Sequence, residues 1–458
     1  MIEMRILLIN SPFSRGYYSS MPPLGLAYIA SVLRQGGHSV KIVDMNVSAE
    51  RLPSRFDNFD LVGISSDTPR HNISIQIAKK AKEQKTPVIM GGPHVTFMDE
   101  ESLKSGAVDY VVRGEGEYSM LNLVEHLSSG DDVKDVAGIS YLKSGDVVRN
   151  PNHQLIADLD ILPLPARELL PMNKYTVKLG GWRATSVITS RGCPFNCSFC
   201  SSSELFGLRW RAREPEAIVD EVEQIKEQYN IDAILFMDDN FTLNPNRTIR
   251  ICELMNHRNL NIRWWFFSRV DTIVNREDMV QSMADAGALT AFVGVESPNQ
   301  DVLNDYKKGI TADISYRAIQ ILRKYKIRSV AGFIIGGLNE TREMIKDTIK
   351  FAIKWNPDIA QFSILTPYPG TRLFESVKGN LLTHNWAFHN VLHEYPKFPL
   401  RRSYNEKCGC GDYRRKCCRS TVRYNMSGAL SRKECNADPE RGEGTNSLRD
   451  TLYLYDYR

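Results

Sequence analysis

The chain has 458 residues, 42% of them hydrophobic and 24% charged, which is an ordinary globular composition for two or three domains. The first ten residues lack a basic region followed by a long apolar run, and no stretch approaches ~20 uninterrupted apolar residues. We therefore expect neither a signal peptide nor a spanning helix, and a cytoplasmic location. In a reducing compartment, clustered cysteines indicate metal or redox chemistry rather than disulfides.

The net charge of +4 is unevenly distributed along the chain. Residues 397–458 hold ten Arg, four Lys and eight acidic residues, a balance of +6, which leaves −2 for the first 396 residues. A nearly neutral body lacks the basic footprint of a nucleic-acid-binding protein, so no nucleic-acid partner is expected.

Residues 1–145 alternate short apolar strands with helices. Such a pattern is typical of a doubly wound parallel α/β sheet, in which ligands bind beyond the carboxyl ends of the strands. The expected strands are Arg5–Asn10, Ser39–Asp44, Leu61–Ser66, Pro87–Gly92 and Tyr110–Gly114, and the expected helices are Pro23–Gly37, Ile73–Gln84 and Tyr118–Ser128.

Residues 146–183 contain a proline-rich stretch without a clear period and are expected to form a linker. A second strand–helix repeat fills residues 184–375. Its six units predict a partial (β/α)6 barrel of the TIM type, with the chemistry at the carboxyl ends of the strands. The expected strands are Thr185–Ser190, Ala233–Asp238, Arg263–Arg269, Ala291–Glu296, Ser329–Gly336 and Ile359–Leu365.

Three cysteines, Cys193, Cys197 and Cys200, follow the first strand of the expected barrel in the stretch TSRGCPFNCSFCSSS. Thiolates are soft ligands that suit iron–sulfur clusters or zinc. Three of them on one loop can hold three irons of a 4Fe–4S cube and leave the fourth iron open. The alternative is a zinc site completed by a distant His or Cys.

The CxxxCxxC spacing, with Phe199 before the last cysteine, resembles the radical S-adenosylmethionine superfamily. Further matches are MDDNFT, GVES, GFIIGGLNET and TPYPGT, and together they cover Ala184–Phe374. The resemblance implies that S-adenosylmethionine chelates the open iron and is cleaved reductively to a 5′-deoxyadenosyl radical. It also implies an electron donor of the flavodoxin or ferredoxin type.

The resemblance assigns roles to residues at the strand ends. Phe199 would lie against adenine, Asp238 and Asp239 would receive the methionyl ammonium, Ser268 and Arg269 the carboxylate, Glu296 the ribose, and Gly332, Gly336 and Gly337 would allow close approach of the nucleoside. Each role has an alternative: the two aspartates could cap the following segment, Arg269 could form a structural ion pair, and Glu296 could be a solvated strand end.

The first domain resembles the cobalamin-binding domain that is fused to one branch of this superfamily. The matching pieces include DLVGISSDT, GGPHVTFMDEE and VVRGEGE, and they imply cobalamin contacts at Ser65, Thr68, Gly91, Gly92, His94, Gly114 and Glu115. The DxHxxG motif that supplies a cobalt ligand in many cobalamin proteins is absent. His94 is the nearest candidate for the lower face of the corrin. A degenerate domain that binds nothing, or an ordinary nucleotide-type sheet, is the alternative.

Residues 376–458 are expected to be irregular, because the pattern breaks after about Glu394 and the tail is basic and poor in large aliphatic residues. Relatives usually continue here with amphipathic helices. Five cysteines could ligate a second cluster or zinc, but their spacing fits no known pattern, and an altered or disordered terminus is favoured. They are Cys408, Cys410, Cys417, Cys418 and Cys435.

The expected activity is cobalamin-dependent methyl transfer to an unactivated carbon of a small-molecule or lipid-like substrate. A radical cyclase or oxidoreductase on the same scaffold is the first alternative. A non-catalytic sensor that binds cobalamin or an iron–sulfur cluster is the second.

Overall fold

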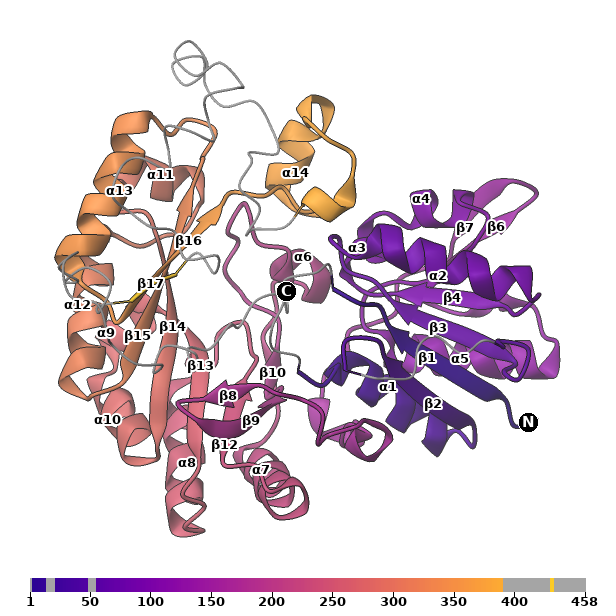
Figure 1. Ribbon diagram of the computed structural model, residues 1–458, viewed down its shortest axis with the longest axis horizontal. Helices are drawn as coiled ribbons and strands as arrows, with labels where there is room; N and C mark the ends of the chain where they lie inside the picture. The colour runs from indigo at the N-terminus through magenta and orange to yellow at the C-terminus, as the bar shows by residue number, and fades with distance from the viewer. Residues whose placement is uncertain (1, 14–20, 48–54, 390–428, 432–458) are drawn as a thin grey trace, which may run out of the picture.

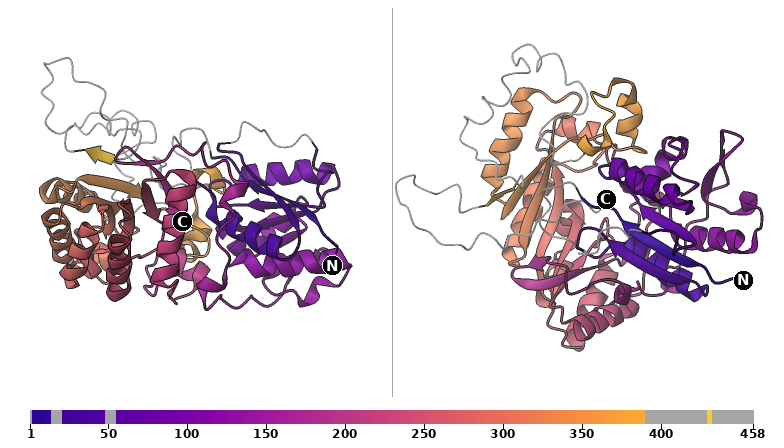
Figure 2. Two further views of the ribbon diagram at one scale, coloured as in Figure 1. Left: turned by 90° about the horizontal axis from the view of Figure 1, so that it is seen from below. Right: turned by 45° about the vertical axis from the view of Figure 1, so that its right-hand side comes forward.

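The computed structural model describes residues 2–13, 21–47, 55–389 and 429–431. Two α/β units lie side by side, the first domain at the right of Figure 1 and a curved second sheet at the left. Figure 2 shows that the carboxyl edges of the two sheets face each other across the junction. The tail cysteines from Cys408 to Cys435 lie outside the described residues.

The first sheet has seven strands in the order β2-β1-β3-β4-β5-β6-β7. Strands β1 to β5 are parallel, as predicted, whereas β6 and β7 form an antiparallel hairpin at one edge. Its turn residues, Ser144 and Gly145, have φ of 53° and 91°, as a tight two-residue hairpin turn requires. The predicted boundary at residue 145 falls in this turn. The strands are β1 (Arg5–Asn10), β2 (Ser39–Asp44), β3 (Leu61–Ser65), β4 (Val88–Gly91), β5 (Tyr110–Val112), β6 (Ile139–Lys143) and β7 (Asp146–Arg149).

The register of the parallel strands aligns their carboxyl ends. Asn10 pairs with Asp44 on one side and with Ser65 on the other, and Ser65 pairs with Gly91. Because these ends are level, their polar side chains and backbone groups form one continuous edge. This edge is where a doubly wound sheet binds its ligands.

Helices cover both faces of the first sheet, so its strands are buried on both sides. Alternate residues of β1 enter different cores: Ile6 and Leu8 pack with α1 and α5, whereas Leu7 and Ile9 pack with α2, α3 and α4. The helices are α1 (Leu24–Gln35), α2 (His71–Glu83), α3 (Pro93–Phe97), α4 (Asp99–Lys104) and α5 (Gly116–Ser129).

The second sheet confirms the predicted six-strand partial barrel. Its order is β17-β16-β15-β14-β13-β12-β9-β8, and the strands from β9 to β16 in this sheet run parallel. An antiparallel strand, which was not predicted, closes each edge. The strands are β8 (Lys178–Leu179), β9 (Trp182–Val187), β12 (Ala233–Phe236), β13 (Arg263–Arg269), β14 (Ala288–Glu296), β15 (Arg328–Ile335), β16 (Ile359–Ile364) and β17 (Ala429–Ser431).

Helices pack on the outer face of this sheet (Figure 1). Adjacent aromatics of β13 separate the two faces, since Trp264 lies in the outer core and Trp265 in the inner one. In the described part of the chain, no helix is long and apolar enough to span a membrane. The helices are α6 (Ser202–Phe206), α7 (Pro215–Tyr229), α8 (Pro245–His257), α9 (Val270–Asn275), α10 (Glu277–Asp285), α11 (Gln300–Asp305), α12 (Ala312–Lys324), α13 (Arg342–Trp355) and α14 (Arg372–Val377).

Short elements make up the connections. The expected linker, residues 146–183, is not wholly irregular: β7 lies at its start, β8 and the first residues of β9 lie at its end, and two 3-10 turns lie between them. A small antiparallel pair brackets the cysteine loop. These elements are η1 (Val133–Asp135), η2 (Leu159–Ile161), η3 (Arg167–Leu169), η4 (Lys378–Asn380), η5 (Trp386–Phe388), β10 (Ser190–Arg191) and β11 (Arg211–Ala212).

Buried ion pairs join the two domains. Glu115, at the start of α5, accepts hydrogen bonds from Arg191 and Arg211 of the cysteine-loop pair, with N–O distances of 2.8–2.9 Å. Arg191 also donates to Glu117 at 2.5 Å. Burial opposes ionisation of Glu115, but Arg211 and Arg191 hold its pKa below the ordinary value. The junction is therefore charged, dry and specific in its geometry.

Candidate cofactor site

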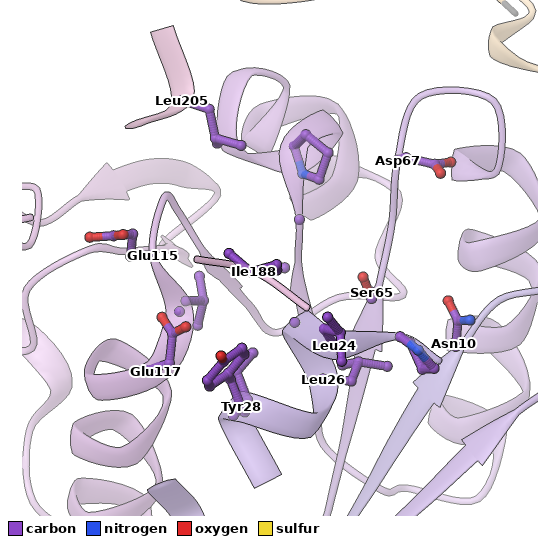
Figure 3. A pocket seen from close by; sticks show the side chains of 18 of the residues that line it. Asn10, Leu24, Leu26, Tyr28, Ser65, Asp67, Glu115, Glu117, Ile188 and Leu205 are labelled. Carbon is purple, nitrogen blue, oxygen red and sulfur yellow. The ribbon is translucent and has the colours of Figure 1, made fainter. Parts of the chain in front are cut away.

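A cavity of about 330 Å³ lies between the carboxyl edge of the first sheet and the cysteine loop (Figure 3). This volume is within the range of ~300–1,000 Å³ of ordinary ligand pockets. Asn10, Ser65 and Asp67 form a polar end, whereas Tyr28 and Ile188 belong to an apolar side. Both domains contribute to the lining, so a ligand here contacts the two at once.

The cysteine loop borders this cavity. Ser190 and Arg191, before the loop, and Ser201 and Ser202, after it, all line the cavity. Of the three cysteines of the loop, Cys197 is buried, and Cys193 and Cys200 are partly exposed. Burial raises the pKa of the Cys197 thiol.

Asp238 anchors the base of the loop. Its carboxylate accepts hydrogen bonds from the backbone N–H groups of Thr189 and Ser190 at 2.6 and 2.9 Å, and from the Thr189 hydroxyl. The residue is 1% exposed, and burial raises its pKa although Arg247 opposes the change. The predicted role as ammonium ligand stays a prediction, and the geometry favours positioning of the loop.

Asp239 points the other way and lines the cavity. Its carboxylate accepts a hydrogen bond of 2.7 Å from Ser202. Of the two aspartates, Asp239 is therefore the one in reach of a ligand that lies against the cysteine loop.

Arg269 and Ser268 end β13 beside the loop. The Arg269 side chain donates to Asp271 at 2.9 Å, and its guanidinium lies 3.6 Å from the centre of the Phe195 ring. Ser268 shares a hydrogen bond of 2.6 Å with Thr242. Arg269 thus has the structural ion pair considered above, and its cationic group also lies directly against the cysteine loop.

Glu296 ends β14 in a left-handed conformation with φ of 62°, at a break in the register of the strands. It is 6% exposed, so it is not a solvated strand end. Its carboxylate pairs with the buried Lys308 ammonium at 2.6 Å. Lys308 lies close enough to oppose the rise in the Cys197 pKa. No motif in the sequence marked Lys308, because a single lysine after a helix carries no signature.

The glycines in and after β15 serve different purposes. A Cβ on Gly332 would lie 2.7 Å from the Phe292 ring, so this glycine makes room for packing inside the sheet. Gly336 has φ of 86°, and its N–H and that of Gly337 donate to Glu340 at 2.6 and 3.0 Å. Burial raises the pKa of Glu340. Glu340 was not predicted as a site residue, although it closes the GFIIGGLNE stretch.

Phe199 packs edge-on against Tyr306, with 5.4 Å between ring centres. It belongs to a small core with residues of α11 and α14 rather than standing free. An adenine would contact it only across its remaining exposed face.

Among the residues assigned to cobalamin, Ser65, Gly91, Gly92, Gly114 and Glu115 line the cavity. The Glu115 carboxylate already pairs with Arg191 and Arg211 at the domain junction.

Thr68 and His94 do not line the cavity. The His94 ring is 0% exposed, and its Nδ1 lies 3.2 Å from the Thr68 hydroxyl. It packs against His71 and Trp386 instead of facing the sheet edge. The expectation that His94 approaches the lower face of a corrin is therefore not met in this structure.

Comparison with known proteins identifies the family. The Radical SAM superfamily matches residues 187–352, and the B12 binding domain matches residues 15–124. A protein of Pyrococcus horikoshii named an uncharacterized methyltransferase is 42% identical over 404 residues, covering 85% of this chain and 87% of the relative. The chain belongs to the cobalamin-binding radical S-adenosylmethionine enzymes.

Further relatives agree with this assignment. The anaerobic magnesium-protoporphyrin IX monomethyl ester cyclase of Rubrivivax gelatinosus is 33% identical, covering 85% of this chain and 73% of its own. The radical S-adenosylmethionine methyltransferase TsrM of Kitasatospora setae, solved with cobalamin and a [4Fe-4S] cluster, has the same fold at a TM-score of 0.68 and 20% identity, over 84% of this chain and 76% of its own. The cofactors of this enzyme family are a 4Fe–4S cluster, S-adenosylmethionine and cobalamin.

The residues of this radical S-adenosylmethionine enzyme fit those cofactors. Three cysteine side chains on one loop suit the cluster, because thiolates are the soft ligands that iron–sulfur clusters take. The Ser190 hydroxyl, which lines the cavity, is buried without a hydrogen-bond partner among the residues that the structure describes. Such an orphaned polar group at the cavity wall suits a ligand that offers a partner.

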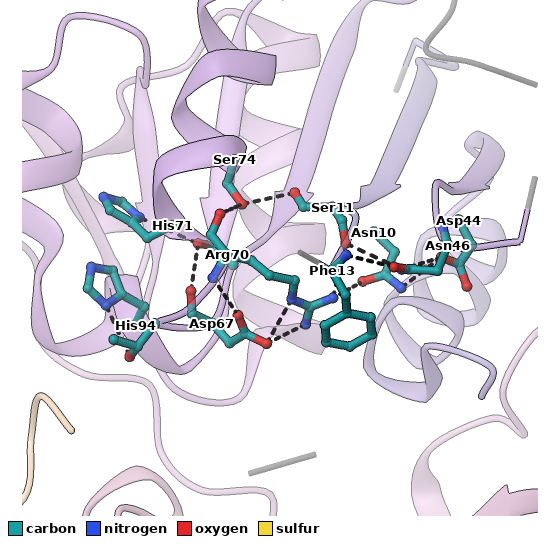
Figure 4. Close-up of polar contacts among 12 residues, drawn as sticks. Asn10, Ser11, Phe13, Asp44, Asn46, Asp67, Arg70, His71, Ser74 and His94 are labelled. Atoms are coloured by element: carbon teal, nitrogen blue, oxygen red, sulfur yellow. Dashed lines mark hydrogen bonds and ion pairs between the residues drawn. The ribbon is translucent and has the colours of Figure 1, made fainter. Parts of the chain in front are cut away.

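Arg70, which was not predicted, adds a buried cation at the edge of the first sheet (Figure 4). Its side chain donates to Asp67 at 2.8 Å and to the Asn10 side chain at 2.9 Å, and it stacks on Phe13. This network ties the loop after β3 to the end of β1. Arginines after strands are common, so the sequence carried no specific signal for it.

Gly92 sets the shape of the loop that lines the cavity. Its φ of 109° favours glycine, and a Cβ would lie 2.6 Å from the Ser66 carbonyl oxygen. We expect Gly92→Ala to lower the free energy of unfolding by about 1–3 kcal/mol, measured by urea denaturation. Gly379→Ala is the control, since among the described residues other than Gly379 and its chain neighbours no atom lies within 4 Å of the added Cβ. Equal effects of the two substitutions would contradict the strain at Gly92.

Proposed function

We propose that this enzyme transfers a methyl group to an unactivated carbon of a small-molecule or lipid-like substrate. The observation that carries the proposal is the single cavity shared by the edge of the B12-binding sheet and the cysteine loop. When bound, the cluster and S-adenosylmethionine supply a 5′-deoxyadenosyl radical, and cobalamin supplies a methyl carrier. The fold brings both sites to one space, as a methyl transfer between them requires.

The protein's own residues bind and orient S-adenosylmethionine. Around the cysteine loop, Arg269 and Lys308 are cationic, whereas Asp239 and Glu296 are anionic. This arrangement complements the carboxylate and ammonium of a methionyl group. The apolar side of the cavity limits access of water to a radical.

A cyclase or oxidoreductase is the second candidate. It is supported by the 33% identity to the Rubrivivax gelatinosus protein, which is named a cyclase. Both candidates need an electron donor, for which a flavodoxin or ferredoxin is proposed, and both suit the cytoplasmic location expected from the sequence.

Comparison of metabolites and lipids between a strain lacking this gene and its parent tests the proposal. Methyl transfer predicts that the deletion strain accumulates a compound lighter by one CH2 and loses its methylated partner. Cyclase or oxidoreductase chemistry instead predicts a pair that differs in hydrogen or oxygen content, and this result would replace the first candidate.

Lys308→Met tests the proposed binding of S-adenosylmethionine. Removal of one partner from a buried charge pair costs about 2–5 kcal/mol, so we expect the Kd for S-adenosylmethionine to rise at least about tenfold. The titration follows the change in the electron paramagnetic resonance signal of the reduced cluster. Lys324→Met is the matched control, because that lysine is exposed and pairs with Glu277. An unchanged Kd in a Lys308→Met protein of native stability would remove Lys308 from the binding site.

A further inference from the structure

Two histidines and a carboxylate meet at the amino-terminal ends of three helices of the first domain. His71 begins α2, His94 lies in the first turn of α3, and Glu101 lies in the first turn of α4. Their potential ligand atoms all lie within 4.8 Å of one another. None of the three lines the cofactor cavity.

One ring nitrogen of each imidazole lies near a hydroxyl group of the loop after β3. His94 Nδ1 lies 3.2 Å from the Thr68 hydroxyl, and His71 Nδ1 lies 3.4 Å from the Ser66 hydroxyl. The remaining nitrogen of His94, Nε2, is buried without a hydrogen-bond partner in the described ranges of the chain. Figure 4 shows the two rings one above the other at the end of the Arg70 network. Orientation of one ring nitrogen by a second residue is typical of metal-binding histidines.

The unpartnered nitrogen of His94 needs an explanation. Burial of an imidazole nitrogen without a partner is unfavourable, because the nitrogen has lost its hydrogen bond to water. The ring is 0% exposed, so bulk water does not reach it. A metal ion bound at Nε2 would give this nitrogen a partner.

Glu101 can bind such an ion and accept a hydrogen bond from Trp386 at the same time. The indole N–H of Trp386 donates to its two carboxylate oxygens at 2.8 and 3.1 Å. One oxygen suffices for the indole, which leaves the other for a metal. The Trp386 ring also packs edge-on against His94, 4.9 Å between centres, and covers the site.

We propose that His71, His94 and Glu101 bind a zinc ion, with water completing a tetrahedral site. Two imidazole nitrogens and a carboxylate oxygen are a donor set that suits zinc, at distances of about 2.0–2.2 Å. Bound zinc ties the ends of α2, α3 and α4 together beneath Trp386. It also fixes the Ser66–Thr68 loop, whose middle residue, Asp67, lines the cofactor cavity.

The test uses the full-length, cluster-loaded enzyme, in which iron occupies the cysteine loop. The protein is dialysed without oxygen against buffered zinc, and zinc and iron are measured separately by mass spectrometry. Glu101→Gln and His71→Asn are each expected to raise the Kd of this zinc at least about 10–100-fold, the loss seen when even an outer partner is removed. Glu100→Gln is the matched control, because Glu100 is adjacent, exposed and paired with Lys104.

Melting temperatures and anomalous diffraction show whether the zinc binds at these three residues. Zinc should raise the melting temperature of the parent and of Glu100→Gln, and should do so less for Glu101→Gln. A crystal grown with zinc should show an anomalous peak at the zinc edge between His71, His94 and Glu101. Zinc binding that is equal in all variants, or a peak only at other residues, would overturn the proposal.

Discussion

Cys197→Ala is expected to abolish the iron–sulfur cluster and all formation of 5′-deoxyadenosine. Three thiols on one loop leave no spare ligand, so loss of one removes a corner of the cluster site. Cys197 is also the most buried of the three and lies near Lys308 and Glu296, where S-adenosylmethionine is proposed to bind. The measurements are iron content, cluster absorbance and 5′-deoxyadenosine after addition of S-adenosylmethionine and dithionite.

Cys252→Ala is the matched control for this experiment. Cys252 is buried in the outer core of the barrel on α8, away from the loop. Its substitution should lower stability slightly and leave iron content and product formation intact. Activity that persists in Cys197→Ala, or that is lost equally in Cys252→Ala, would contradict the assigned role of the loop.

Glu115→Ala is expected to lower the free energy of unfolding by about 3–5 kcal/mol, because it removes the carboxylate that pairs with the buried side chains of both Arg191 and Arg211. Arg191 retains Glu117, but Arg211 loses its ion pair. Because Arg191 flanks the cysteine loop, the same change should weaken cofactor retention. Chemical denaturation and the cobalamin absorbance of the purified protein measure the two effects.

The contribution of Glu115 to the free energy of unfolding decreases at low pH. The folded pKa lies below that of the unfolded chain, so the stabilisation is fully present above about pH 4.5 and is lost as pH falls through the folded pKa. Glu216→Ala is the control, since its pair with Arg250 is exposed to solvent and contributes little to stability. A loss at Glu115 no larger than at Glu216 would refute the buried junction.

Strand patterns in the sequence predicted the two sheets well, because parallel strands buried on both faces are continuous apolar runs. β13 and β1 begin and end at the predicted residues. The β6–β7 hairpin was not predicted. Its strand Asp146–Arg149 is short and half exposed, so it lacks the continuous apolar run that marked the five parallel strands of this sheet.

Side-chain partners were less predictable. The sequence placed Asp238 and Asp239 together at a strand end, yet one holds the cysteine loop and the other faces the cavity. His94 and Glu115 follow β4 and β5 in the chain, but packing and ion pairs from distant segments determine where their side chains point. Lys308 and Arg70 act through such long-range contacts and have no local signature.

The most direct test of methyl transfer through cobalamin follows a labelled methyl group. The full-length enzyme, loaded with cluster and cobalamin, is incubated with reductant and S-adenosylmethionine whose methyl group is deuterated, and the cobalamin is analysed by mass spectrometry. Methyl transfer predicts deuterated methylcobalamin together with 5′-deoxyadenosine. Formation of 5′-deoxyadenosine while the retained cobalamin stays unmethylated would contradict methyl transfer as the function of this site.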